Sequence, residues 1–146
     1  MPRHSETREL PYTPAQMYDL VADVARYPEF LPWTAAARIR SREGENPEVM
    51  LADLIISFKV FRESFGSKVM LWPDENRIET EYLDGPFRHL KSEWRFEETA
   101  AGCRVQFWID YEFRNPLIGR VVGTVFDQAM QRVVAAFETR ARKLYG

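Results

Sequence analysis

Short breaker-rich segments interrupt the middle of the chain at intervals of about ten residues, and this spacing constrains the fold more than any other feature. They contain glycine, proline, asparagine or acidic residues and lie at 43–47, 73–76, 84–86 and 99–102. The strand-like runs beside them cover 37–42, 49–58, 61–72, 77–83, 88–98 and 103–114. Because turns this short join antiparallel neighbours, the spacing predicts an antiparallel meander.

The last of these runs indicates that the sheet has one apolar face. Its apolar side chains alternate with mostly polar ones, and they are Val105, Phe107, Ile109, Tyr111 and Phe113. Alternation with a period of two places these five on the same face of a strand. An apolar sheet face has to be covered by another element of the chain.

Helical patterns stand on both sides of the predicted meander. A short strand over 5–10 leads into a helix start, where Thr13 and Gln16 complete a capping box. A second short helix is expected over 27–30. At the other end, apolar residues at helical spacing predict one long helix from about Pro116 to Leu144.

These elements together predict an α+β fold. We expect a curved antiparallel sheet of about six or seven strands that wraps around a long C-terminal helix, with two short helices after the first strand. The chain shows no internal repeat, low-complexity segment or linker, so we expect residues 1–146 to form a single domain.

The segment RYPEFLPWT, residues 26–34, carries more apolar surface than a connection needs. Its two prolines disfavour a long helix or a central strand. One interpretation is a lip, formed by Tyr27, Phe30, Leu31 and Trp33, that gates a cavity and touches a membrane surface. The other is a plug that only anchors the short helices. Replacing Phe30 with aspartate separates the two, because a plug is needed for folding and a lip for ligand uptake.

Charge and composition narrow the functional class. The chain has 20 basic and 22 acidic residues and a net charge of −2, which does not favour a general grip on nucleic acid, so no DNA partner is expected. Its single cysteine, Cys103, excludes an intrachain disulfide. The first ten residues contain no apolar run, and no segment is apolar enough to span a bilayer. We therefore expect a cytoplasmic protein that at most contacts a membrane surface.

No pattern in the chain points to catalysis. The two histidines, His4 and His89, are far apart in sequence, and we expect both to face solvent, with His4 in a frayed terminus. Neither has neighbours typical of nucleophilic or metal chemistry, and no phosphate-binding loop is present. We therefore predict no catalytic residue, no metal and no cofactor.

The segment DVARYPEFLPW, from Asp23 to Trp33, is similar to a signature of the START-like, polyketide-cyclase-like superfamily. The branch concerned contains the coenzyme Q-binding proteins and the ribosome-association toxin RatA. Thr34 stands where a cysteine is common in that branch, so a role that depends on the cysteine is not implied. The stretches LDGPFRHLKSEWRF (83–96) and DYEFRNPLIG (110–119) are also similar. The resemblance implies the helix-grip fold, with a cavity for an apolar ligand between sheet and C-terminal helix.

The resemblance further implies a carrier of an isoprenoid quinone, above all ubiquinone (coenzyme Q), or of another lipid, that supports respiration at the inner face of the respiratory membrane. Its candidate cavity wall consists of side chains on faces that we assign inward. They are Tyr27, Phe30, Leu31, Trp33, Phe61, Phe65, Tyr82, Trp94, Phe107, Ile109, Tyr111, Val122, Phe126, Met130 and Val133. The same side chains can equally fill a solid core, and the sequence does not separate the two.

The free energy of burial indicates that the isoprenoid tail contributes more to binding than the quinone head group. Each buried methylene contributes about 0.8 kcal/mol, so an isoprene unit contributes about 3 kcal/mol before entropy costs. A hydrogen bond to a quinone carbonyl adds about 1 kcal/mol. Tyr82, Tyr111 or a nearby arginine is expected to orient the head group.

Two alternatives follow from the same resemblance. A toxin that binds the large ribosomal subunit and blocks subunit association requires a basic surface, for which Arg38, Arg40, Arg42 and the cluster 140–143 are candidates. An enzyme similar to a polyketide cyclase or dehydratase requires one or two polar groups in the pocket. The hairpin FKVFRESF (58–65) is a second candidate for membrane contact.

Overall fold

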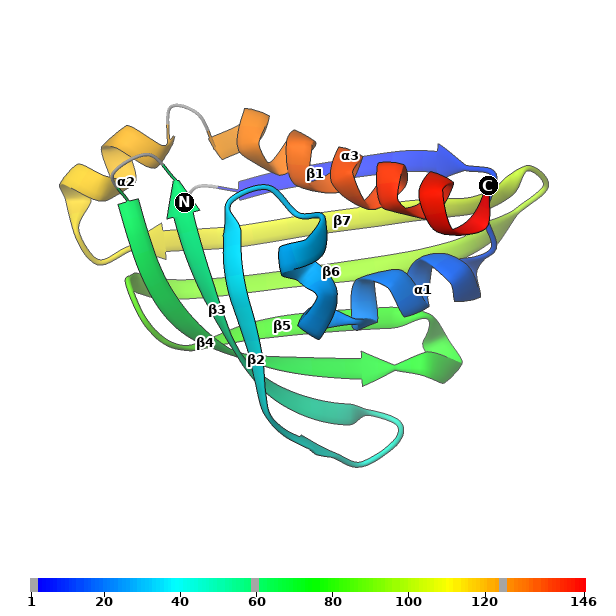
Figure 1. Cartoon of the computed structure of the whole chain (residues 1–146), viewed down its shortest axis with the longest axis horizontal. Helices are drawn as coiled ribbons and strands as arrows, with labels where there is room; N and C mark the ends of the chain where they lie inside the picture. Colours follow the sequence, from blue (N-terminus) through cyan, green and yellow to red (C-terminus); the bar gives the residue numbers. More distant parts are fainter. Residues whose placement is uncertain (1–2, 59–60, 124–125) are drawn as a thin grey trace.

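The described residues form one curved antiparallel sheet. The computed structural model describes residues 3–58, 61–123 and 126–146, and the side chains of Phe58 and Phe61 lie outside that description. Its seven strands follow the order β1-β7-β6-β5-β4-β3-β2. They are β1 (Arg3–Leu10), β2 (Thr34–Glu43), β3 (Glu48–Phe58), β4 (Phe61–Trp72), β5 (Arg77–Asp84), β6 (Phe87–Thr99) and β7 (Gly102–Phe113). Strands β2 to β7 form the expected meander, and β1 pairs with β7, so β1 and β2 are the edges (Figure 1).

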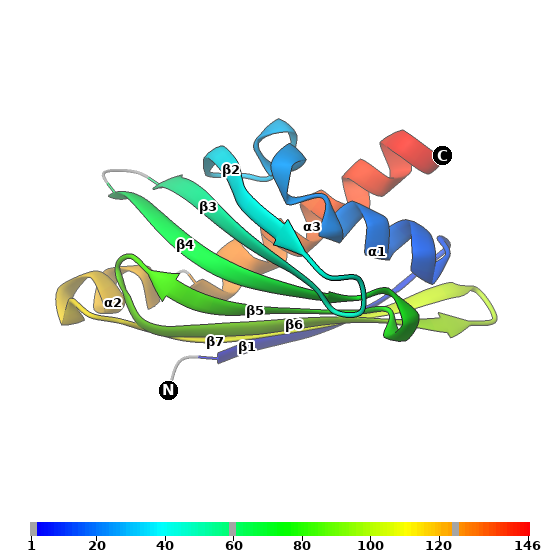
Figure 2. The same cartoon turned by 90° about the horizontal axis from the view of Figure 1, so that it is seen from below.

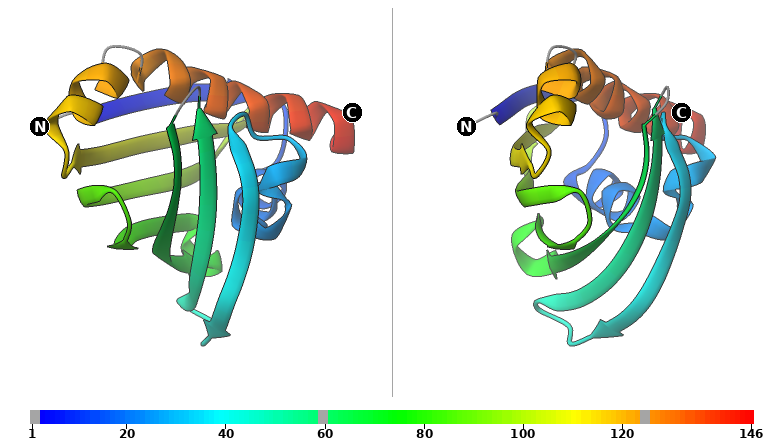
Figure 3. Two further views of the ribbon diagram at one scale, coloured as in Figure 1. Left: turned by 60° about the vertical axis from the view of Figure 1, so that its left-hand side comes forward. Right: turned by 90° about the vertical axis from the view of Figure 1, so that its left-hand side faces the viewer.

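Helices lie on the concave side of this sheet. They are α1 (Pro14–Ala22), the 3-10 helix η1 (Val24–Glu29), α2 (Pro116–Gly123) and α3 (Phe126–Tyr145), and a short 3-10 helix, η2 (Pro73–Glu75), joins β4 to β5. The sheet curves around α3, and α1 lies in the same layer (Figures 2 and 3). The predicted α+β architecture is therefore confirmed. The predicted long C-terminal helix is α3, and its predicted bounds of 116–144 also take in the residues described as the separate helix α2.

The start of α1 follows from its local sequence. Thr13 Oγ1 accepts a hydrogen bond from the backbone N–H of Gln16 at 3.1 Å, and Gln16 Oε1 accepts one from the backbone N–H of Thr13 at 3.0 Å. This capping box pairs amide groups that a helix N-terminus otherwise leaves unsatisfied. It fixes where the helix begins, and Met17, Leu20 and Val21 then face the core.

The alternation of β7 is reproduced in its burial. Val105, Phe107, Ile109, Tyr111 and Phe113 are all buried, whereas the residues between them are half-buried or exposed. The Tyr111 ring lies 3.9 Å, between centroids, from that of Phe126 of α3, so the buried side chains point to the side of the sheet that α3 covers. The predicted apolar face of the sheet is therefore the face that meets the helices.

Polar contacts from β1 hold one side of α3. His4 is buried, and its two ring nitrogens lie 3.1 Å from carboxylate oxygens of Glu6 and of Asp127, which is in the first turn of α3. Arg8 of β1 donates to Glu138 at 3.2 Å. The expectation that His4 is solvent-facing and frayed is wrong, because pairing of β1 with β7 carries it under α3.

Candidate ligand-binding cavity

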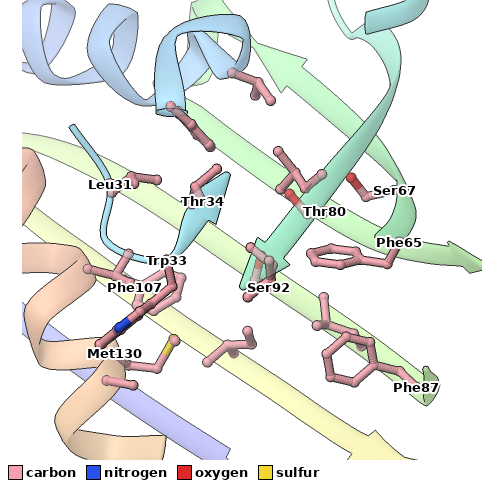
Figure 4. Close-up of a pocket in the computed structure, with 18 of the residues that line it drawn as sticks. Leu31, Trp33, Thr34, Phe65, Ser67, Thr80, Phe87, Ser92, Phe107 and Met130 are labelled. Carbon is pink, nitrogen blue, oxygen red and sulfur yellow. The ribbon is translucent and has the colours of Figure 1, made fainter. Parts of the chain in front are cut away.

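A cavity of about 270 Å³ lies between the concave face of the sheet and the helices. Its wall is built from α1, η1 and the loop that follows, from strands β2 to β7, and from α2 and α3. Most of the lining side chains are aliphatic or aromatic, and Glu63 is the single carboxylate among the described lining residues. Figure 4 shows Trp33 and Met130 at one side of the cavity and Phe65 and Phe87 at the other. The concave face therefore surrounds a space as well as a packed core.

Most side chains that the sequence predicted for the wall do line this cavity. They are Tyr27, Leu31, Trp33, Phe65, Trp94, Phe107, Ile109, Val122, Phe126, Met130 and Val133. Period-two alternation in the strands and helical spacing in α2 and α3 bring them to one place. The predicted wall residue Phe61 falls on a side chain outside the described residues.

Two predicted tyrosines do not line the cavity, although both point inward. Tyr111 is packed between rings, with its centroid 3.9 Å from that of Phe126, and burial raises its pKa to about 12. Tyr82 lies against Phe87, with centroids 5.7 Å apart. The cause is simple: on a concave face, neighbouring rings cover some inward-pointing side chains.

The segment 26–34 divides between the two roles considered for it. Phe30 does not line the cavity; its ring centroid lies 5.3 Å from that of Phe137, and the Arg140 guanidinium lies 5.1 Å from the Phe30 ring. Tyr27 lines the cavity but donates its hydroxyl to the carbonyl of Val21, and burial raises its pKa far above the usual value. This part of the segment anchors η1 against α3, as a plug does.

The other part of the segment lines the cavity in a strained conformation. Trp33 has a φ of 62°, a left-handed value that costs a bulky residue about 1–3 kcal/mol. Leu31 and Thr34, on either side of it, also line the cavity. The strained backbone therefore sits at the cavity wall, where backbone strain is commonly retained for function.

Three hydroxyl side chains on inner strands of the sheet line the cavity and were not predicted from the sequence. Ser67 of β4, Thr80 of β5 and Ser92 of β6 all line the cavity (Figure 4). Thr80 and Ser92 are directly opposite each other in the β5–β6 register. The alternation that turns Ile78 and Trp94 inward also turns these residues inward. The period-two pattern could therefore have identified them, but it was used to assign only apolar side chains to the wall.

Most cations proposed as a basic surface are paired with carboxylates. Arg40 binds Asp53, which raises the pKa of Arg40 and lowers the pKa of Asp53, and it lies 3.5 Å from Asp84. Arg42 binds Glu48 at 2.8 Å. In the C-terminal cluster, the guanidinium of residue 140 lies 3.0 Å from a carboxylate of η1, and that of residue 142 lies 3.3 Å from one on α3. The outer surface is therefore an interleaved mixture of charges.

Further observations concern metal binding, membrane spanning and the second histidine. No group of three His, Cys, Asp or Glu side chains in 3–58, 61–123 and 126–146 is placed to hold a metal ion. In the same residues, no helix is long and apolar enough to cross a membrane. His89, the second histidine, is half-buried on the outer face and lies 3.3 Å from Asp110.

Comparison with known proteins gives the family. The family described as polyketide cyclase / dehydrase and lipid transport matches residues 10–138. The ribosome association toxin RatA of Rickettsia prowazekii is 36% identical over 141 residues, which covers 94% of this chain and 94% of RatA. The mitochondrial coenzyme Q-binding protein COQ10 homolog B of Xenopus laevis is 32% identical, over 98% of this chain and 59% of its own length.

A solved structure shows the same fold. A START superfamily protein from Mycobacterium smegmatis superimposes with a TM-score of 0.84 at 21% identity, over 97% of this chain and 98% of that protein. The helix-grip fold that the motif around Tyr27 implied is therefore confirmed. The chain belongs to the polyketide cyclase, dehydrase and lipid transport family.

Proposed function

We propose that this protein binds an isoprenoid quinone, most simply ubiquinone, in the cavity and carries it without chemical change. The observation that supports this most is the cavity itself, because apolar side chains from the sheet and both C-terminal helices line it. Such walls suit a ligand held mainly by apolar burial, with few polar groups for orientation. The coenzyme Q-binding name of one relative agrees with this choice.

The size of the cavity limits how much of such a ligand it holds. A cavity of about 150 Å³ can hold a benzene ring. The cavity volume of about 270 Å³ is therefore suited to a quinone ring and the beginning of its tail. A long isoprenoid tail would continue outside, which fits a carrier that meets its ligand at a membrane surface.

A membrane contact is best supported at α2. Leu117 and Val121, one helical turn apart, are 68% and 70% exposed, and the exposed Arg120 lies beside them. Val122, on the same helix, lines the cavity. An exposed apolar pair with an adjacent cation suits the interface of an anionic membrane. Helix α2 would then join the membrane surface to the cavity.

The direct test is to ask what the purified protein carries. Native mass spectrometry of freshly isolated protein, followed by solvent extraction and lipid analysis, should find an isoprenoid quinone at near-stoichiometric amount. Protein that is isolated empty should take up added ubiquinone with a stoichiometry of one. Failure to carry or to take up any quinone would contradict the proposal.

Binding to a ribosomal subunit is the second candidate, because the relative named RatA matches nearly the whole chain. The pairing of Arg40 and Arg42 with carboxylates weighs against a phosphate-binding surface there. Sedimentation with separated ribosomal subunits at low and high salt tests it, since phosphate contacts are salt-sensitive. Salt-sensitive co-sedimentation with the large subunit, by protein that takes up no quinone, would favour this candidate.

A further inference from the structure

We propose that Ser67, Thr80 and Ser92, called here the hydroxyl row, bind an oxygen acceptor of the ligand, so that the quinone ring enters the cavity first. This inference rests on the proposed function and adds the orientation of the ligand. It replaces the expectation that Tyr82, Tyr111 or an arginine orients the head group. The three hydroxyls are polar groups in a wall that is otherwise mainly apolar.

Two members of the hydroxyl row are buried and Thr80 is half-buried, and the row lacks partners within the described part of the protein. Ser67 is 2% exposed and Ser92 is 7% exposed. Among the described residues, no side-chain hydrogen bond joins Ser67, Thr80 or Ser92 to each other or to another group. Buried hydroxyls are normally hydrogen-bonded, because an unpaired one keeps its full desolvation cost. The oxygens of the row are not fully enclosed by protein atoms, so two buried hydroxyls and one half-buried hydroxyl present unpaired donors to the cavity, where a ligand can accept from them.

A neighbouring tyrosine adds an independent sign of the same kind. Tyr82 lies directly opposite Ser67 in the β4–β5 register, and its buried hydroxyl has no hydrogen-bond partner among the described residues. Hydroxyl groups without a hydrogen-bond partner are therefore concentrated on the neighbouring strands β4, β5 and β6. Tyr82 does not line the cavity, so it is not included in the hydroxyl row.

The register brings two of the hydroxyls within reach of one acceptor. Thr80 and Ser92 are directly opposite each other on neighbouring strands and face the same side. The Cβ atoms of such a pair lie about 5 Å apart, and a hydroxyl hydrogen bond spans about 2.8 Å. One carbonyl oxygen above the pair can therefore accept from both. Ser67 is diagonal to Thr80 on the next strand, which extends the row to a second oxygen on the same ring.

The position of the hydroxyl row sets the direction of the ligand. Ser67 and Ser92 belong to inner strands of the sheet and are nearly inaccessible, whereas the lining residues Leu31, Trp33 and Met130 are half-exposed. Figure 4 shows Leu31, Trp33 and Met130 on one side of the cavity and Ser67 on the other. A ring bound to the hydroxyl row leaves its tail to point toward the half-exposed side.

The test compares two probes and two variants. The probes are decylubiquinone and decylbenzene, which share a tail and differ in the quinone oxygens. Thr80→Val/Ser92→Ala removes the paired hydroxyls, and Thr7→Val/Ser5→Ala makes the same changes at exposed positions of β1. Removing hydroxyls that have no partner in the protein should leave the ligand-free cavity variant at least as thermally stable as the unmodified protein.

The expected result is a loss that is specific for the quinone. The cavity variant should bind decylubiquinone about thirtyfold more weakly, because two hydrogen bonds are lost, and should bind decylbenzene unchanged. The infrared carbonyl stretch of the bound quinone should be lowered in the unmodified protein and rise in the cavity variant. The β1 variant should match the unmodified protein in every measurement.

Other results would overturn the inference in distinguishable ways. Unchanged quinone affinity and carbonyl stretch in the cavity variant would reject the hydroxyl row and leave the proposed function standing. Equal weakening for both probes would show that the hydroxyls only shape the cavity, and would also reject it. If the unmodified protein bound neither probe, the proposed function would fail and this inference with it.

Discussion

Apolar side chains are packed together at one end of α3, beside η1, and are exposed to solvent at the other end, on α2. At the η1 end, the Phe137 ring lies 5.4, 5.3 and 5.2 Å from the rings of Tyr27, Phe30 and Trp94, measured between centroids. An ion pair between α3 and η1 closes the same contact. Aromatic rings there pack against one another as well as lining the cavity, so this end is tightly packed.

The α2 end shows the reverse arrangement. Helix α2 has no buried residue, and its exposed aliphatic side chains Leu117 and Val121 face away from the protein. The aromatic cluster at the η1 end therefore stabilises the fold, whereas the aliphatic side chains of α2 form a surface that is available for contact. Apolar content alone does not say which segment meets a partner, because burial depends on what packs opposite.

The largest expected contrast is in stability. Phe137→Ala should lower the free energy of unfolding by about 3–5 kcal/mol, because it leaves a cavity among three rings. Val121→Ala, at the α2 end, should change it by less than about 0.5 kcal/mol. Urea denaturation followed by circular dichroism measures both. Equal losses at the two ends would remove the distinction between them.

Thiol labelling should separate the two ends next. Cys103 is fully buried at the start of β7, and burial raises its pKa to about 11. Strand β7 begins at the end of the molecule where α3 ends (Figure 1). At pH 8 the thiolate fraction is therefore about a hundredfold below that of an ordinary thiol, and reaction with a thiol reagent should be slower still. A cysteine introduced by Val121→Cys should react at once. Rapid labelling of Cys103 in the folded protein would show that the η1 end opens.

Phe30 tests whether the η1 end acts as a plug. Phe30→Ala should lower the free energy of unfolding by about 2 kcal/mol, since the half-buried ring packs against Phe137 and Arg140. The protein that remains folded should still take up decylubiquinone. Unchanged stability together with lost uptake would instead support a lip at this position. Parallel thermal melts and uptake assays decide between the two.

The smallest effect concerns membrane binding by α2. Leu117→Glu/Val121→Glu should weaken binding to vesicles with anionic lipid by about tenfold, because it removes two apolar contacts and adds like charge. Thermal stability should stay the same. Ser5→Glu/Thr7→Glu adds the same charge on β1 and serves as the control in vesicle flotation. Equal weakening by both variants would mean that charge alone, and not α2, governs the contact.

The order of strands and helices could be predicted almost completely from the sequence. Period-two alternation in β7, breaker-rich turns and the capping box at Thr13 are local signals, and each was reproduced. The description of α2 and α3 as separate helices was not predicted, because apolar residues recur at helical spacing from one to the other. His4 was misplaced because its burial depends on β1 pairing with β7, about 100 residues later in the chain.

The cavity was predictable only in part. Alternation shows which side chains point inward, and most of the predicted wall followed from it. Whether Phe30 lines a space or packs on Phe137 depends on the path of η1 across α3, which no local pattern records. The hydroxyl row was visible in the alternation, but its lack of partners is a property of the folded wall alone.

The most direct measurement follows tryptophan fluorescence as decylubiquinone is added. Trp94 lines the cavity, whereas Trp108 is on the outer face, with its indole N–H donated to Glu93 at 3.3 Å. Two variants isolate the two positions. Each retains one of these tryptophans and has phenylalanine in place of the other three. A quinone that enters the cavity should quench Trp94 emission to saturation at one equivalent and leave Trp108 nearly unchanged. Unchanged Trp94 emission, or equal unsaturable quenching of both, would contradict quinone binding in the cavity.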